Sequence, residues 1–398
     1  MYKRILLLLL ISGSLMGQNS NYSSYGFGLA TPYLSVRSLG LGNTGVAIAD
    51  SLSLNIANPA LWNGFVTTSL QGQAGSSMLG DQQGILTQFL GFSLKFPVGD
   101  KIGLAMGITP VTRMEGKKSF TDSTSFGSTA VNYSSDVQVS GGISQFFIGG
   151  GYRVSPRFQL GLKAQVHFGN YLTKMDTDLD DDGSVNSYFK KYTIVQGVQI
   201  GTGSYWISQD RKSELALYLD YRLKFESYRM YDFYFGDDST TSHQAIPYPA
   251  TFQLGVRRKI SKSLAFSADV SHSIVSSSLF KDFYVLEESE SQNSSYIGLG
   301  IEKEKPYRPG ASIWQQMALR GGAYYKSDMI YQSGGLKETG ISIGVGLPFM
   351  QNLNRVDLAV VAAIRDGFLN ETYGKEKVLS FYLSVTTGDL WFRKFKRF

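Results

Sequence analysis

The stretch Glu214-Leu-Ala-Leu-Tyr-Leu-Asp-Tyr-Arg-Leu-Lys-Phe-Glu226 alternates between two kinds of side chain. One face carries Leu215, Leu217, Leu219, Tyr221, Leu223 and Phe225, and the other carries Glu214, Asp220, Arg222, Lys224 and Glu226. A two-residue period is the period of a β-strand. At roughly 3.3 Å per residue, this stretch is longer than most strands of globular sheets. Its length suits a tilted strand that crosses an apolar layer of about 25 Å.

The same alternation recurs elsewhere in the chain, so the sequence predicts an all-β protein. The clearest further examples are residues 102–108, 158–168, 264–270, 356–364 and 379–385. A soluble sandwich of two sheets has the same period, with its core on one side and water on the other. Alternation alone therefore leaves the choice between a sandwich and a membrane barrel open.

The connections between the predicted strands are of two kinds. Short turns are predicted at residues 97–100, 155–157, 209–212, 259–262, 327–329 and 350–354, and longer polar stretches at 113–136, 173–190, 228–247, 276–311 and 366–376. Short turns at one end and long loops at the other are typical of outer-membrane barrels. Six short turns imply seven hairpins, and therefore a transmembrane antiparallel β-barrel of about 14 strands. The stretch 324–340 fits this plan least well, so 12 or 16 strands stay open.

The N-terminus predicts export. Lys3 and Arg4 precede a short apolar run, and small residues up to Gly17 provide a cleavage site, as in a secretory signal peptide over residues 1–17. The run is too short to span a bilayer as a helix. The net charge of +6 is too small and too scattered to indicate nucleic acid. The 25 Phe and 24 Tyr suit an interfacial girdle, so we expect the outer membrane of a Gram-negative bacterium.

A glycine-rich segment precedes the first predicted barrel strand. It reads Arg37-Ser-Leu-Gly-Leu-Gly-Asn-Thr-Gly-Val-Ala-Ile-Ala-Asp50 and is followed by Asn58-Pro-Ala-Leu61. Its glycines match G-x-G-x-x-G, but no apolar strand precedes them and no βαβ unit surrounds them. We interpret them as positions where backbone packs closely against backbone.

These residues resemble the FadL-type family of outer-membrane transport proteins for long-chain fatty acids and other hydrophobic compounds. In that family a similar N-terminal region forms a hatch that plugs a 14-stranded barrel. The matching residues here are Gly45, Asp50, Asn58, Pro59 and Ala60. The C-terminal run Gly388-Asp-Leu-Trp-Phe392 is similar to relatives of the PorV kind, which serve protein secretion. The resemblance covers only the two ends of the chain.

The resemblance implies an organisation and a function. We expect a signal peptide at 1–17, a hatch or plug segment at 18–63, a barrel at 64–392 and a basic tail at 393–398. The implied function is passive uptake of hydrophobic compounds such as long-chain fatty acids. The alternative is a structural or secretion-associated barrel that binds protein partners. Outer-membrane lipids would surround the barrel in either case.

An aspartate-rich stretch is a candidate calcium loop. Asp178, Asp180, Asp182 and Asn186 match positions 1, 3, 5 and 9 of such a loop, but position 12 is Phe189 instead of the bidentate glutamate. A solvated acidic loop tip is the alternative. Ca²⁺ is thus the one cofactor that the sequence suggests.

Charged residues on the polar faces of the strands are expected to line the lumen. They are Lys163, Glu214, Asp220, Arg222, Lys224, Glu226, Arg257, Asp269 and Asp357. Their mixed signs predict cross-strand pairs that brace the interior and anchor the hatch. The three histidines have neither metal-ligand spacing nor a neighbouring nucleophile motif, so we predict no enzymatic activity.

Overall fold

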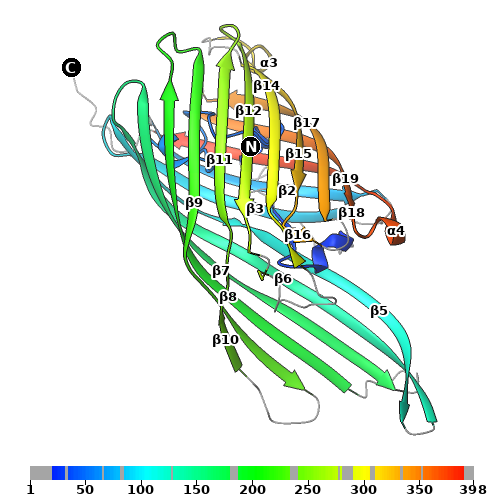
Figure 1. Cartoon of the computed structure of the whole chain (residues 1–398). Coiled ribbons are helices and arrows are strands. Elements are labelled where there is room, and N and C mark those ends of the chain that lie inside the picture. The colour runs from blue at the N-terminus through cyan, green and yellow to red at the C-terminus, as the bar shows by residue number, and fades with distance from the viewer. Residues whose placement is uncertain are drawn as a thin grey trace.

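The strands close into one antiparallel β-barrel, which in the described part of the chain has 14 strand positions (Figure 1). The computed structural model describes residues 20–31, 35–64, 67–80, 85–126, 129–179, 187–233, 241–276, 278–279, 290–304, 310–331, 335–350 and 353–389. The predicted barrel and its strand number are confirmed, and the sandwich is excluded because the last barrel strand pairs with the first.

The barrel wall starts at Thr68 and ends at Asp389. Its first half comprises β2 (Thr68–Leu79), β3 (Ile85–Pro97), β4 (Ile102–Pro110), β5 (Thr112–Phe126), β6 (Thr129–Arg153), β7 (Phe158–Leu179), β8 (Ser187–Ile207) and β9 (Ser213–Phe233). Its second half comprises β10 (Thr241–Ala245), β11 (Ala250–Lys259), β12 (Leu264–Ile274), β14 (Ser294–Lys303), β15 (Ala318–Ser327), β17 (Leu336–Phe349), β18 (Asn354–Gly367) and β19 (Glu376–Asp389). β4 and β5 share one wall position because both pair with β6, and β10 and β11 share another because both pair with β9.

The remaining elements are short. The N-terminal segment, residues 20–31 and 35–64, contains η1 (Asn21–Ser24), β1 (Leu29–Ala30), α2 (Val36–Leu39) and η2 (Pro59–Leu61). The connections of the barrel contain β13 (Glu290–Ser291), α3 (Ile313–Gln316), β16 (Ile330–Tyr331) and α4 (Asn370–Tyr373). No helix in the described residues is long and apolar enough to cross a membrane.

One end of the barrel, the turn end, holds Thr68, Asp389 and the short turns; the opposite end is the loop end. The predicted short turn at 327–329 was wrong, because the chain there connects β15 to β17 at the loop end. The predicted loop at 276–311 was also wrong, because it contains β14. The sixth connection at the turn end is instead the segment between β14 and β15, which contains α3. The two errors compensate, so the strand number was still correct.

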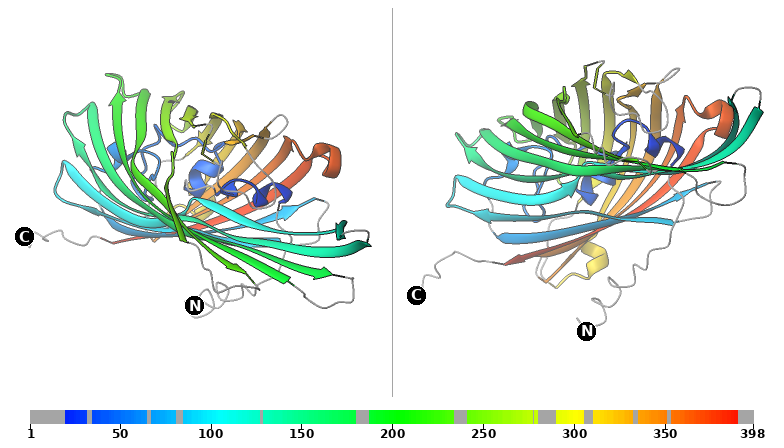
Figure 2. Two further views of the ribbon diagram at one scale, coloured as in Figure 1. Left: turned by 60° about the horizontal axis from the view of Figure 1, so that its bottom comes forward. Right: turned by 90° about the horizontal axis from the view of Figure 1, so that it is seen from below.

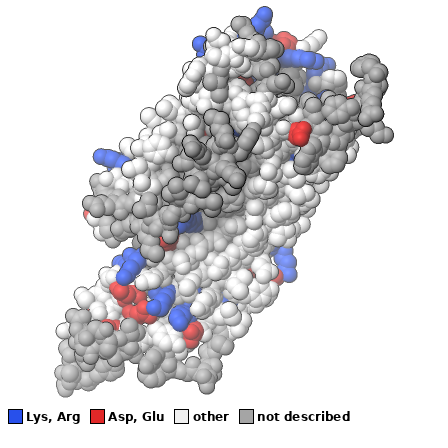
Figure 3. All heavy atoms as spheres, turned by 180° about the vertical axis from the view of Figure 1, so that it is seen from behind, with Lys and Arg blue, Asp and Glu red and all other residues white. Residues whose placement is uncertain are grey.

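The outer face of the barrel is apolar. Leucine, isoleucine, valine and phenylalanine side chains on this face are 36–65% exposed, for example Leu162, Leu219, Val256, Ile343 and Phe381. Figure 3 shows charged atoms gathered towards the ends of one face, with a largely uncharged region between them. Such a surface is stable only against lipid. The protein is therefore an outer-membrane barrel.

A β-bulge in β9 reverses the faces of that strand. Val198 of β8 pairs with Lys224, and Gln199 pairs with Arg222, so Leu223 is an extra residue. Phe225 is consequently buried in the interior, and Lys224 lies outside with its side chain 71% exposed. Glu226 shares the outer face with Lys224, to which it is paired at 2.8 Å. The prediction that Lys224 and Glu226 line the lumen was therefore wrong.

The N-terminal segment lies inside the curve of the barrel wall (Figure 2). Its apolar side chains, including Val36, Leu54, Ile56 and Trp62, are almost fully buried. They form clusters with inward-facing residues of the wall, such as Phe147 with Trp62. The segment thus provides a core to a barrel whose own inner face is largely polar.

Candidate functional site

A buried arginine connects the N-terminal segment to the barrel wall. The side-chain oxygen of Ser35 accepts a hydrogen bond from the Ser38 backbone and starts α2, which holds Arg37 in place. Nε and Nη2 of Arg37 donate to the two carboxylate oxygens of Glu302 at 3.0 and 2.7 Å. Nη1 donates to Asp50 at 2.8 Å. This two-pronged geometry is the strong form of an arginine–carboxylate pair.

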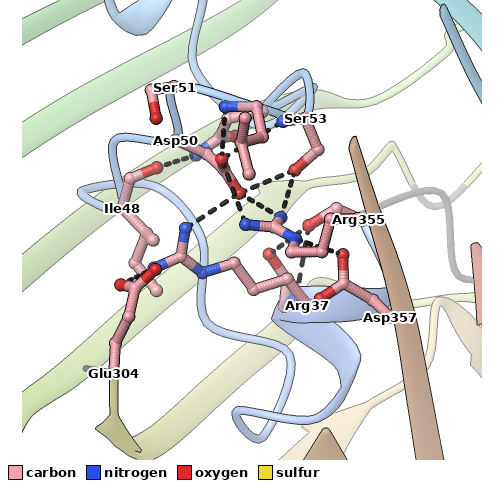
Figure 4. A network of polar contacts seen from close by, with 12 residues as sticks. Arg37, Ile48, Asp50, Ser51, Ser53, Glu304, Arg355 and Asp357 are labelled. Carbon is pink, nitrogen blue, oxygen red and sulfur yellow. Dashed lines mark hydrogen bonds and ion pairs between the residues drawn. The ribbon is translucent and has the colours of Figure 1, made fainter. Parts of the chain in front are cut away.

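Asp50 lies between two guanidinium groups (Figure 4). It accepts hydrogen bonds from Arg37 and Arg355, and also from the Leu52 and Ser53 backbone at 2.9 and 3.1 Å. Burial opposes ionisation, but Arg355 and Arg37 hold the pKa of the Asp50 carboxyl well below its usual range. Asp50 is therefore a carboxylate that fixes the turn after the glycine-rich segment to β18.

The same network continues around the inner wall. Arg320 of β15 donates to Glu302 at 2.9 Å and to Asp357 at 2.6 Å. Arg257 of β11 contacts Glu302 at 3.1 Å and Glu214 at 3.6 Å. All five side chains are at least 89% buried. Positive and negative side chains alternate along this network, so each buried charge has an opposite charge beside it that offsets the cost of its burial.

Asn58 anchors the second half of the N-terminal segment. Its Oδ1 accepts from the Ala60 backbone at 2.9 Å and caps η2, whose first residue is Pro59. Its Nδ2 donates to the carbonyls of Val46 and Ser204, both at 3.2 Å. The N-terminal segment can pack directly against the wall backbone here because the wall positions that face it are glycines. A Cβ on Gly161 would lie 2.1 Å from the Pro59 carbonyl carbon.

Gly45 is held by a wall carboxylate. Oδ2 of Asp269, on β12, accepts from the backbone of Gly45 at 2.6 Å and of Val46 at 2.8 Å. Two consecutive amides on one oxygen are a typical carboxylate-binding arrangement. Among the described residues Asp269 forms no ion pair, and its Oδ1 is buried without a hydrogen-bond partner.

A cavity of about 320 Å³ lies between the N-terminal segment and the wall. This volume is at the small end of the range of ligand pockets, about 300–1,000 Å³. Aromatic rings on its surface are Phe27, Tyr248, Tyr296, Tyr324 and Tyr382, and polar side chains include Asn43, Thr112, Gln145, Gln165, His167, Gln199, Asp220, Gln253 and Asp269. The cavity can hold a small molecule between aromatic and hydrogen-bonding groups.

The wall is interrupted beside this cavity. Pro110 ends β4, and β5 continues along β6 past a bulge in which residues 111–113 lie opposite Gly142 and Ile143. β3 pairs with β4 only over Phe92–Pro97. In the described residues no ladder joins the other half of β3 to β5, whose free edge pairs instead with β1. Val111 and Thr112, at the interruption, both line the cavity.

The other predicted lumen residues lie on the inner face. Five of them are buried there: Lys163, Glu214, Arg257, Asp269 and Asp357. Asp220 accepts a hydrogen bond from Gln165, and Arg222 donates one to the Tyr248 carbonyl. The residues predicted to form a hatch contact one another or the wall, as described above: Gly45, Asp50, Asn58, Pro59 and Ala60.

The candidate calcium loop lies mostly outside the described residues. Asp178 is the second-last residue of β7, whereas Asp180, Asp182 and Asn186 lie outside the described residues. In the part of the chain that the structure describes, no group of three or more potential ligands could hold a metal ion. Calcium binding therefore stays a prediction.

Sequence reasoning missed the arginines that organise the site. Arg37 was quoted only as the start of a motif, and Arg320, Arg355 and Glu302 were not proposed. Arg355 could have been found, since it lies two residues before Asp357 and therefore on the same strand face. Glu302 was hidden because its strand was taken for part of a loop.

The fold and the site define an outer-membrane barrel with an inserted N-terminal segment, which is the architecture of the FadL-type transport proteins. A Pseudomonas aeruginosa FadL homologue is similar at 14% identity and a TM-score of 0.62, over 91% of this chain and 99% of that one. The toluene transporter TbuX of Ralstonia pickettii is similar at 15% identity and 0.56, over 92% and 99%. The monoaromatic hydrocarbon channel CymD is similar at 14% identity and 0.55, over 93% and 99%.

Sequence comparison is more specific than these similarities of fold. A family model described as BamG matches residues 1–397, and the chain belongs to this family. No curated protein matches the sequence. The FadL-type resemblance seen at the two ends of the chain is therefore confirmed at the level of the whole fold.

Proposed function

We propose that this barrel is a passive channel for small, largely hydrophobic molecules across the outer membrane. The observation that carries the proposal is the aromatic-lined cavity beside the interruption between β3 and β5. Because β3 and β5 are not paired at this point, a molecule can pass sideways beside β1 of the N-terminal segment, which pairs with β5 at Thr112 and Arg113. A small cavity favours single-ring compounds over a fully enclosed long acyl chain.

The N-terminal segment has the role of a hatch in this proposal. Its ion pairs with Glu302 and Arg355 hold it across the lumen at the turn end. A straight route along the barrel axis would require several buried ion pairs to separate, which is costly. The lateral route beside Val111 requires none of them to break, so we expect it to be the path of the molecule.

Uptake of toluene into proteoliposomes tests this function. A tryptophan in place of Val111 would fill the space next to the interruption, and we expect the rate to fall about tenfold, a barrier increase of about 1.4 kcal/mol. Val256→Trp, on the lipid-facing side of β11, is the matched control and should leave the rate unchanged. A rate no higher than that of protein-free liposomes would refute the proposal.

A docking role for protein partners is the second candidate, and one observation supports it. β5 to β9 continue beyond the loop end as a curved sheet (Figure 1). The outer face of this sheet carries exposed ion pairs, Lys117–Asp136 at 3.3 Å and Lys190–Asp232 at 3.8 Å. Purification under mild detergent is the test: a stoichiometric protein partner that is lost when the sheet is shortened favours docking.

A further inference from the structure

The exposed basic side chains at the two ends of the barrel differ in their partners. At the loop end lysines pair with carboxylates, for example Lys117 with Asp136 at 3.3 Å and Lys375 with Asp366 at 2.5 Å. At the turn end, five exposed basic side chains form no ion pair with any described residue: Arg211, Lys212, Arg258, Lys262 and Lys303. The turn end therefore carries positive charge that the described chain leaves without a direct partner.

The acidic residues near this charge are engaged elsewhere. Asp210 is the one acidic residue in the β8–β9 and β11–β12 turns, and its carboxylate already accepts hydrogen bonds within its own turn. Glu302 and Glu304, on either side of Lys303, both contact Arg37 of the N-terminal segment. Among the described residues, the negative counterpart of these cations is therefore missing.

Two of these cations lie at the edge of the lipid-facing surface. Arg258 on β11 is opposite Phe266 of β12, and Lys303 on β14 is opposite Leu264 of β12. β12 lies between the two strands (Figure 1), so the cations are two strand spacings, about 10 Å, apart. Beside them on the outer face, Phe266 and Ile301 are 40% and 47% exposed. An apolar surface thus ends in a pair of positive charges.

This edge has the features of a membrane interface. Short turns of outer-membrane barrels face the periplasm. At the same end, Trp314 of α3 is 71% exposed and Ile260 in the β11–β12 turn is 61% exposed. Exposed tryptophan is typical of the headgroup level of a bilayer. The phosphates of the periplasmic leaflet therefore lie at the level of Arg258 and Lys303.

The contacts of Arg258 leave it able to bind a phosphate group. Its Nη1 donates to Ser213 Oγ at 3.2 Å, which ties the side chain to β9, and its other N–H groups have no partner among the described residues. A guanidinium binds phosphate oxygens with two parallel N–H groups, whereas a lysine ammonium acts as a point charge. Both side chains can lay their carbon stems along apolar surface and reach the headgroups. Arg258 and Lys303 can therefore approach one headgroup from two sides.

We infer that the turn-end edge of β11, β12 and β14 is a binding site for an anionic phospholipid of the periplasmic leaflet, with Arg258 and Lys303 holding its phosphate group. The acyl chains of this lipid lie on Phe266 and Ile301. A net negative headgroup is preferred, because a zwitterionic headgroup brings a cation of its own that the two side chains repel. The site goes beyond the proposed channel function and does not depend on it.

The double variant Arg258→Gln, Lys303→Gln tests this site, since it removes two charges from exposed side chains. The barrel in a neutral detergent is mixed with equal amounts of phosphatidylglycerol and phosphatidylcholine that have the same acyl chains, and native mass spectrometry measures the ratio of the two lipids bound. We expect the wild type to prefer phosphatidylglycerol at least about tenfold and the double variant to lose this preference, because each basic residue near an anionic headgroup contributes about fivefold in affinity.

The matched control is the double variant Lys117→Gln, Lys174→Gln. It removes the same charge from two loop-end lysines that have aspartate partners, and it should leave the preference intact. Arg258→Lys keeps the charge and should keep most of the preference. Raising the salt concentration should weaken the preference of the wild type, since exposed charges are screened.

Equal binding of the two lipids by the wild type, or a preference that the Arg258, Lys303 variant keeps, would overturn the inference. An equal loss in the loop-end control would also overturn it, because net charge alone would then set the preference. Inorganic phosphate that binds the lipid-free barrel as tightly as phosphatidylglycerol does would identify a free anion as the ligand instead of a lipid.

Thermal unfolding in detergent shows whether the double variant keeps its fold. If it unfolds at a lower temperature than the wild type, the single variant Lys303→Gln tests the same point. We expect this change at the exposed end of β14 to lower the preference about fivefold. An unchanged lipid ratio in a folded Lys303→Gln barrel would count against the inference.

Discussion

Asp50 shows how much structure a single side chain can organise. It accepts hydrogen bonds from two arginines that are far apart in the sequence, Arg37 and Arg355, and from the backbone of its own turn. Removing one member of a buried ion network leaves the others unpaired, so the effect exceeds that of a surface pair. Without Asp50, Arg37 would still be paired with Glu302 and Arg355 with Asp357, which limits the loss of stability.

We predict that Asp50→Asn lowers the local stability of the N-terminal segment by about 3 kcal/mol and leaves the barrel folded. Hydrogen exchange of residues 36–62 measures this loss, and Asp100→Asn in the exposed β3–β4 turn is the control. Because the folded-state pKa of Asp50 is lowered, its contribution is fully present above the ordinary carboxyl pKa, near 4, and is lost as the pH falls through the folded pKa. The difference in protection between the wild type and Asp50→Asn should therefore be constant from pH 5 to 8, since both proteins keep the other groups that hold this turn, such as Lys95, which donates to the Ser51 carbonyl at 2.7 Å. A loss of this difference within that range would contradict the role of Asp50.

At the scale of elements, β9 has an unbroken two-residue period in its sequence but a β-bulge in its structure. Glu214 to Glu226 alternates without error, yet the bulge at Leu223 turns the second part of the strand over. Before the bulge the apolar face meets lipid. Beyond it the apolar Phe225 packs on His167 inside, and Lys224 points outward. One extra residue thus matches a single sequence pattern to two environments.

The absence of cysteine from the chain makes this reversal simple to test. We predict that Lys224→Cys in the folded barrel reacts with a water-soluble maleimide, and that Phe225→Cys is protected at least about tenfold, since a buried thiol is poorly accessible. If the alternation continued without a bulge, the two rates would be exchanged. Denaturation before labelling should make the two variants equally reactive and serves as the control.

This strand also shows what a sequence can predict and what it cannot. Alternation identifies most of the strands, because each barrel strand has one face towards lipid, but their number came from the predicted turns and was correct only because two errors compensated. A bulge leaves no trace in a regular pattern, so the positions of Lys224 and Glu226 could not be found. β14 was missed for a different reason. Gly298 and Gly300 occupy inward positions on that strand, and the polar face that marks a strand is largely absent. Partners such as Arg37 and Glu302 depend on which strands are neighbours, which only the closed barrel establishes.

At the scale of the whole molecule, closure depends on a single seam. β19 pairs with β2 along its length, and on the inner face Ser380 lies opposite Ser77, with their hydroxyl oxygens 2.8 Å apart. This seam joins residues that are 303 positions apart. Pairing over such a distance is entropically costly, and it removes the two exposed edges that an open sheet would have.

We predict that the double variant Ser77→Cys, Ser380→Cys forms a disulfide on mild oxidation, because directly opposed inward positions bring the two Cβ atoms close together. The cross-link should stabilise the folded barrel by about 4 kcal/mol, since it closes a very long loop. A shift in gel mobility detects the bond, and thermal unfolding in detergent measures the gain. The pair Ser76→Cys, Ser380→Cys is the control, since Ser76 faces outward; a bond forming equally well there would contradict the register.

The anchoring of the N-terminal segment has a consequence for how the protein is made. The segment is synthesised first, but its contacts lie in the parts synthesised last: Glu302 is 265 residues after Arg37, and Arg355 is 305 residues after Asp50. Until β14 and β18 are in the wall, the buried charges of the segment have no counterparts. Insertion of the segment therefore marks completion of the barrel. In a chain truncated before β18, Asp50 would lack Arg355, and residues 35–64 would stay accessible to proteases, which distinguishes an unfinished barrel from a complete one.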